Sequence, residues 1–127
     1  MTIAEHIEQF KIQYPLIRPW EEENDSEWWN EGLDLLDAGK LLQAENSFKK
    51  FLLAQPDLPD GFEGLGLVYE AQGDLLKAEM FLREAASRIE QMVAKGSKNA
   101  VFLDRIQADL SRVLNNQPSQ NSAGAPE

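Results

Sequence analysis

The sequence contains no cysteine and one histidine, His6. Without cysteine the chain cannot form a disulfide, a thiolate metal site or a thiol nucleophile, and a reducing compartment is compatible with this composition. His6 stands beside Glu5 in a short N-terminal segment, on the side that we expect to face solvent, without a partner for nucleophilic chemistry. We therefore expect no catalytic residues, no bound metal and no cofactor.

Long apolar runs are also missing. No stretch approaches the roughly 18 apolar residues that a membrane span needs, and residues 1–15 show no basic leader followed by an apolar run. A chain of 127 residues is long enough for one core and too short for two. We expect a single soluble, cytoplasmic domain without a membrane span.

Basic residues are scarce in the first part of the chain. Residues 1–37 hold ten carboxylates against Lys11 and Arg18, so this segment carries −8 of the net charge of −10. An acidic surface repels phosphate backbones and attracts basic partners, which makes nucleic acid a poor candidate ligand. The acidic groups at 21–23, and Asp34 with Asp37, are interpreted as solvated surface, because no second acidic element converges on them.

The sequence does contain a stretch that occurs twice. Leu-Leu-Gln-Ala-Glu at 41–45 returns as Leu-Leu-Lys-Ala-Glu at 75–79, and Gly39 returns as Gly73, each at an interval of 34 residues. A fixed interval shared by unlike residue types indicates stacked structural repeats.

Hydrophobic spacing, caps and helix breakers predict six helices. Thr2 and Glu5 form a capping box for the first, and Asp60 and Asp74 are expected to cap two others. The predicted spans are 2–14, 26–38, 41–54, 60–72, 75–95 and 99–114. We divide the chain into an N-terminal helix with an acidic connector (1–24), two repeats (25–58 and 59–92, with the last helix extended to 97), a capping helix (98–115) and a disordered tail (116–127).

These residues resemble a pair of tetratricopeptide repeats, the 34-residue helix-turn-helix unit written W-x2-L-G-x2-Y, A-x3-F and P. The resemblance covers residues 25–92 and implies an all-α fold of antiparallel helical hairpins, an α-solenoid, capped by the N-terminal and C-terminal helices. Glu31, Leu35 and Glu90 depart from the pattern, and Phe62 and Leu82 replace its tryptophan and phenylalanine. The repeat-defining positions are Trp28, Gly32, Ala44, Phe48, Pro56, Phe62, Gly66, Tyr69, Ala78 and Leu82.

Glycine and alanine recur where the two helices of each predicted hairpin cross. Gly32 and Ala44, like Gly66 and Ala78, let the backbones approach closely, while the large side chains fill the space between the helices. The run Gly61, Gly64 and Gly66 is interpreted in the same way, because glycines inside a helix do not form a phosphate-binding turn.

The helix at 26–38 has more apolar surface than one hairpin needs. Its apolar side chains span an arc of about 160° at 100° per residue, whereas a surface helix needs roughly 100° to dock. Packing within the hairpin accounts for the stripe of Trp28, Gly32 and Leu35. The second stripe, Trp29, Leu33 and Leu36, is surplus.

By the resemblance, this surplus stripe lies on the concave side of the array. The residues expected to line a partner-binding groove there are Trp29, Asn30, Leu33, Asp37, Glu63, Leu67 and Glu70. A lining that is apolar in the middle and acidic at the rim suits a basic amphipathic helix or extended segment, with Trp29 as the anchor. The family subset that clamps acidic chaperone tails uses lysine and arginine on this face, and only Asn30 fits that pattern. In the alternative interpretation, residues 3–20 cover this surface and Trp29 is part of the core.

We therefore expect a non-catalytic protein-protein interaction module, an adaptor, scaffold or assembly factor that binds a basic peptide or helix of another protein. A chaperone-like protein that shields an apolar client helix is one alternative. A small enzyme or metal-binding regulator is another, from a different class. Both a monomer and a homodimer remain open, because either the N-terminal helix or a second copy can cap the first repeat.

Overall fold

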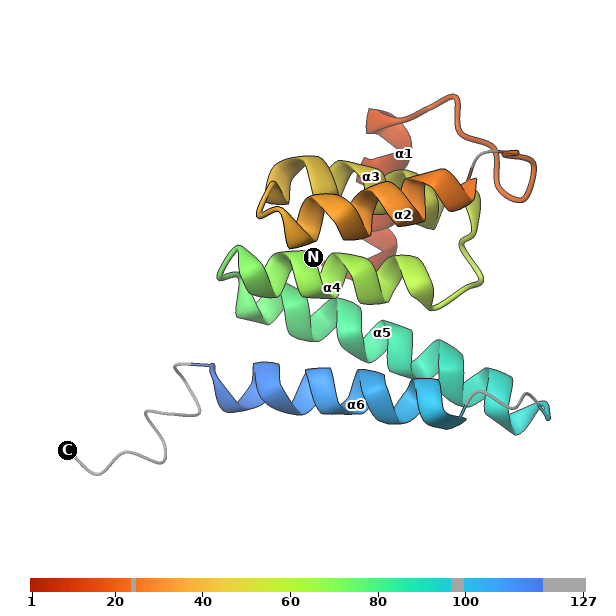
Figure 1. Cartoon of the computed structure of the whole chain (residues 1–127). Helices are drawn as coiled ribbons and strands as arrows, with labels where there is room; N and C mark the ends of the chain where they lie inside the picture. The colour runs from red at the N-terminus through yellow and green to blue at the C-terminus, as the bar shows by residue number, and fades with distance from the viewer. Residues whose placement is uncertain (24, 97–99, 118–127) are drawn as a thin grey trace.

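The structure is a computed structural model that describes residues 1–23, 25–96 and 100–117 (Figure 1). Within those ranges the chain forms six α-helices and no strand, which confirms the predicted all-α class. The helices are α1 (Ile3–Gln13), α2 (Asp25–Asp37), α3 (Leu41–Ala54), α4 (Asp60–Ala71), α5 (Leu75–Ala94) and α6 (Ala100–Asn115). None of these helices combines the length and the apolar character that crossing a membrane requires.

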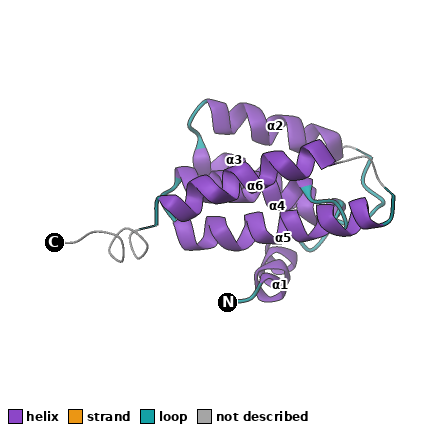
Figure 2. Cartoon of the chain, turned by 90° about the horizontal axis from the view of Figure 1, so that it is seen from below, coloured by secondary structure: helices purple, strands orange, loops and turns teal. Residues whose placement is uncertain are grey.

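The helices pack mainly with their neighbours along the chain. α2 and α3 form one antiparallel hairpin and α4 and α5 form a second, with α3 against α4 and α6 against α5. α1 crosses α3 and α5 on the side of the molecule opposite to α2 (Figures 1 and 2). Residues 3–13 therefore cover the back of both hairpins and do not lie on the face formed by α2 and α4.

The two hairpins turn in the same way. Gly39 and Gly73 adopt φ values of 76° and 85°, which a residue with a side chain adopts only with strain. In each turn the glycine N–H donates to a carbonyl three residues back and the next N–H donates to one five residues back, at 2.9 to 3.0 Å. This pair of backbone hydrogen bonds is a common way to terminate a helix. The two copies, 34 residues apart, therefore share their backbone geometry as well as their sequence.

Glycines at the helix crossings leave no room for a side chain. A Cβ atom on Gly32 would come within 2.6 Å of the Phe48 ring, and one on Gly66 within 2.6 Å of Leu82 Cγ. Gly64, in the second hairpin, lies against the same ring, because a Cβ atom on Gly64 would come within 2.5 Å of Phe48 Cδ1. The phenylalanine of α3 is thus enclosed by glycines of two hairpins, in agreement with the predicted packing role of these residues.

The core runs through α3, α4, α5 and α6. Its large, fully buried side chains are Phe48, Leu52, Phe62, Leu65, Val68, Tyr69, Phe81, Leu82, Ile89, Ile106 and Val113, with Ala44 and Ala78 at the crossings. In α2 the buried residue is Gly32, so this helix rests on the core through half-buried side chains.

The two adjacent tryptophans of α2 lie in different surroundings. The ring of Trp29 lies 5.4 Å from that of Phe48 and 5.5 Å from that of Phe51, so Trp29 packs within the hairpin. Trp28 instead borders a shallow hollow that it shares with Leu16 and Lys50. Trp29, predicted to anchor a partner in the groove, therefore packs inside its own hairpin, because Phe51 lies one turn from Phe48 and the two rings together accommodate it.

Local capping follows the predictions in two of three cases. The Thr2 and Glu5 box is present, with backbone-to-side-chain bonds of 2.9 and 3.1 Å, and Asp74 accepts from the Lys77 N–H at 3.2 Å. Asp60 does not cap α4, because it is the first residue of the helix and Pro59 precedes it.

His6 is buried rather than exposed to solvent. Its side chain packs against Phe10 and Phe81, with the latter ring centroid 5.4 Å away. The predicted solvent position was wrong because His6 lies one turn from Phe10, the residue of α1 that inserts most deeply.

The end of the chain also differs from expectation. Gln117 was placed at the start of a disordered tail, but it is buried and its Nε2 donates to Glu79 Oε1 at 2.6 Å. The rest of that predicted tail, residues 118–127, lies outside the described residues.

Candidate functional site

α2 is the most acidic element of the molecule. It carries five carboxylates and no basic residue. Asp25 and Glu31 accept hydrogen bonds from Gln55 and Ser47, and none of the five forms an ion pair within the described part of the chain. The helix therefore presents negative charge that the described residues do not neutralise.

The acidic residues of α4 are arranged differently, because α6 covers them. Arg105 donates two hydrogen bonds to Glu63 at 2.9 and 3.0 Å, and Arg112 donates two to Glu70, both at 2.7 Å. Seven residues separate the two partners on each helix, which is about two turns. Paired bonds of this kind fix both the position and the direction of the bound helix.

Burial distinguishes these two ion pairs. The Glu63 side chain is 4% exposed and that of Glu70 is 21% exposed. Burial raises the pKa of Glu63, and the bonds from Arg105 only partly oppose this effect. Glu70 and Asp109 together raise the pKa of Arg112 further above its ordinary value. Glu63 and Glu70, both predicted to line a partner groove, are thus already engaged by the chain itself.

The remaining predicted groove residues fall into two groups. Trp29 is half-buried against the α3 phenylalanines. Asn30 and Asp37 are exposed, and Leu33 is half-buried beside them within an arc of about 60° on α2. Leu67 of α4 is also half-buried, and α4 packs against α2. We call Asn30, Leu33, Asp37 and Leu67 the α2–α4 face.

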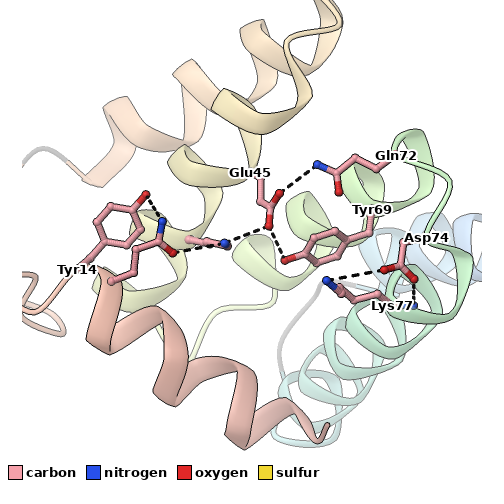
Figure 3. A network of polar contacts seen from close by, with 8 residues as sticks. Tyr14, Glu45, Tyr69, Gln72, Asp74 and Lys77 are labelled. Carbon is pink, nitrogen blue, oxygen red and sulfur yellow. Dashed lines mark hydrogen bonds and ion pairs between the residues drawn. The ribbon is translucent and has the colours of Figure 1, made fainter.

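A polar network joins the two hairpins and was not anticipated from the sequence (Figure 3). Glu45 of α3 accepts from Tyr69 Oη at 3.2 Å and from Gln72 Nε2 at 3.0 Å, and it pairs with Lys49 at 3.0 Å. Burial alone would raise the pKa of Glu45, but these hydrogen bonds lower it on balance. The network fixes the second hairpin against the first.

The corresponding glutamate of the second copy does the same for α6. Glu79 accepts from Gln117 at 2.6 Å, as Glu45 accepts from Gln72. The signal for both contacts was present in the repeated Leu-Leu-x-Ala-Glu, whose glutamate lies outside the tetratricopeptide pattern. α6 is thus bound like the first helix of a further hairpin.

Metal chemistry finds no support in the described ranges. There, no three histidine, cysteine, aspartate or glutamate side chains gather in a way that could hold an ion. The acidic groups of α2 are spread along the helix instead of converging.

Comparison of the chain with family models, with curated proteins and with solved structures gave no match in any of the three. The assignment of the hairpins to a particular repeat family therefore depends on residue spacing and on the shared turn geometry.

Proposed function

We propose that this protein is a non-catalytic protein-interaction module of the tetratricopeptide-repeat type. It acts as an adaptor, scaffold or assembly factor and binds a basic amphipathic segment of another protein on the α2–α4 face. The repeat assignment is supported by the 34-residue interval, by the two matching glycine turns and by the small residues at both helix crossings.

The observation that carries this proposal is the docking of α6. An amphipathic helix with arginines seven residues apart lies against the glutamates of α4, so the chain supplies its own example of a ligand for this row of helices. α2 continues the row with Asn30 and Asp37 exposed and with its carboxylates outside any ion pair of the described residues. A second basic amphipathic segment has complementary charge for that position.

Site-specific photocrosslinking in the native lysate tests the proposal. A benzophenone side chain at Asn30, on the α2–α4 face, is compared with one at Glu90, which is exposed on α5. We expect a discrete crosslinked product at Asn30 that is absent at Glu90, with the crosslinked peptide rich in lysine or arginine. The double variant Asp34→Asn/Asp37→Asn should reduce its yield several-fold, because the attraction between opposite charges is lost.

Two results would count against this function. Equal products at both positions mean that the face has no selectivity. Crosslinks at Asn30 to many unrelated apolar segments, unaffected by the double variant, favour the chaperone-like alternative.

A further inference from the structure

A pocket of about 430 Å³ is lined in part by α1. α1 lies on the side of the molecule opposite to α2 (Figure 2). The walls of the pocket come from α1, from the connector that follows it and from the end of α3. Ile7, Tyr14, Ile17, Trp20, Leu52 and Pro56 make this lining mostly apolar. We call it the connector pocket.

Trp20 lines the connector pocket in an unusual backbone conformation. Its φ of 64° is in the left-handed region, which a bulky residue occupies only when its surroundings enforce it. The enforcing contact is a hydrogen bond of 2.7 Å from its N–H to the carbonyl of Ala54 at the end of α3. The indole remains 62% exposed. A strained backbone thus holds a large apolar side chain beside a pocket that it does not fill.

Other apolar side chains around the connector are exposed as well. Leu16 is 88% exposed and Ile12 is 79% exposed. A second hollow of about 320 Å³ is bordered by Tyr14, Leu16 and Trp28. Exposed apolar groups that gather around pockets mark binding surfaces more often than single exposed residues do.

Among residues 1–127, those outside the described ranges offer no large apolar side chain for the connector pocket. The residues outside the described ranges are Asn24, Ser97, Lys98, Asn99 and the segment 118–127. Their apolar side chains are confined to alanine and proline, and none is leucine, isoleucine, valine, methionine or aromatic. No segment within residues 1–127 thus supplies a large apolar anchor for the connector pocket.

Charge decides between a second copy and a different partner. Residues 21–37 begin directly after Trp20 and carry eight carboxylates with no basic residue. Arg18 does not reverse this balance, and the Nζ of Lys11 on the pocket wall is paired with Glu8 at 3.4 Å. Two copies docked at this pocket would bring their acidic segments together, which opposes association. A basic partner is attracted by the same segments.

We propose that the connector pocket is a second docking site, separate from the α2–α4 face. Its ligand is a segment of another protein that inserts one leucine, isoleucine or phenylalanine side chain and places lysine or arginine against Glu21, Glu22 and Glu23. This site does not depend on the proposed function of the α2–α4 face, because the two surfaces share no residue.

The test uses a synthetic peptide and the full-length, isotope-labelled protein. The probe is the peptide acetyl-Lys-Lys-Ser-Leu-Phe-Ser-Lys-Lys-amide. Its binding is measured by NMR titration, as changes in the backbone amide chemical shifts of the labelled protein. We expect one set of shifts at the non-proline residues of 14–20 and 52–55, and we expect Trp20→Gly to reduce this set without changing any shifts at Asn30 and Asp37. Replacing Leu-Phe in the peptide by Ala-Ala should weaken binding about tenfold or more, because the buried apolar anchor is lost. Raising the salt concentration from about 0.05 to about 0.5 M should also weaken binding of the original peptide, because salt screens the attraction between lysine and the acidic residues.

Trp20→Gly is the matching variant of the protein. Glycine accepts the left-handed backbone without strain, so the fold should be retained while the peptide affinity falls about tenfold. The control is Leu42→Ala, which removes another exposed apolar side chain, 70% exposed, at the start of α3 and away from the pocket. This variant should bind the peptide normally.

Each other outcome overturns the proposal. Absence of binding at millimolar peptide, or binding that Trp20→Gly leaves unchanged, removes the site. Equal affinity for a peptide with glutamate in place of lysine removes the charge argument. A dimer in sedimentation equilibrium that Trp20→Gly dissociates assigns the pocket to a second copy. Crosslinking at Asn30 is unaffected by any of these results, so failure here and failure of the proposed function are distinguishable.

Discussion

At the scale of single residues, one difference between the two copies of the repeat involves a coupled pair of positions. The first copy has Trp29 on α2 and Phe51 on α3, whereas the second has Glu63 and Ala85 at the corresponding positions. In the first hairpin the indole and the phenyl ring are 5.5 Å apart. In the second hairpin Ala85 is small, and Glu63 of α4 forms an ion pair with Arg105 of α6. One hairpin thus uses this position for its own packing, and the other uses it to hold the next helix.

The adjacent tryptophans allow a matched test of this packing. Trp29→Ala should destabilise the protein by about 1–3 kcal/mol, less than the 3–5 kcal/mol typical of a fully buried tryptophan, because Trp29 is only half-buried. Trp28→Ala should cost under about 1 kcal/mol, since Trp28 borders an open hollow. Urea unfolding of both variants gives the two values. A smaller loss for Trp29→Ala than for Trp28→Ala would contradict the structure.

The sequence could not assign these tryptophans because it leaves the rotation of α2 about its own axis undetermined. Both side chains fall within one broad apolar arc, and the choice between them depends on the shape of α3. Phe51 provides that shape, but the repeat pattern says nothing about its position. His6 escaped prediction for a related reason, because the direction in which α1 docks is set by tertiary contacts with α5.

At the scale of helices, local sequence signals were sufficient to predict where each helix begins and ends. Glycine at the turns, proline after α3 and aspartate before α5 fix the helix ends to within about one residue of the predicted ones. The contacts of α6 could not be predicted in this way. Its arginines reach glutamates 42 residues away, and no local rule relates residues at that distance.

The two arginines of α6 should contribute unequally to its docking. Arg105→Met leaves the buried carboxylate of Glu63 without its partner and should cost about 3 kcal/mol at pH 7. Arg112→Met is the control and should cost less than about 1 kcal/mol, because the Glu70 pair is more exposed. Denaturant unfolding at pH 7 measures both.

The pH dependence of the same variant identifies the cause. The pKa of Glu63 is already raised by burial, and loss of Arg105 raises it further. Below that pKa the carboxyl group is neutral and has no charge to bury. The deficit of Arg105→Met should therefore shrink as the pH falls from 7 toward 5, and the double variant Arg105→Met/Glu63→Met should recover most of the lost stability. A deficit independent of pH would show that lost packing of the arginine is responsible instead.

At the scale of the whole molecule, α1 and α6 complete what two hairpins cannot do alone. Two repeats expose apolar surface at both ends of the stack, and three or more are usually needed for stability. α6 covers α5 as a further first helix would, with Gln117 bound to Glu79. α1 instead crosses the backs of α3 and α5 and leaves the connector pocket beside it. The first hairpin is therefore the less completely covered end of the molecule.

The buried His6 makes the docking of α1 sensitive to pH. Burial lowers its pKa below the ordinary value, as does Lys77 of α5, with smaller effects of the same sign from the N-terminus and Lys49 of α3. Glu5 of α1 acts in the opposite direction. Because the folded-state pKa is below the unfolded one, the unfolded state binds the proton more readily. Stability is therefore full above the unfolded-state value of about 6.5 and declines as the pH falls below it.

Thermal unfolding between pH 7.5 and 5 tests this dependence. Between pH 7.5 and 5 the melting temperature of the native protein should fall relative to that of His6→Phe, which keeps an aromatic ring against Phe81 without a titrating group. Glu63, whose pKa is raised, acts in the opposite direction but is present in both proteins. The carboxylates whose pKa is lowered, such as Glu45, lose their contribution only below about pH 4.5 and so do not overlap with this window. If His6→Phe shows the same slope as the native protein, groups other than the histidine control the docking of α1.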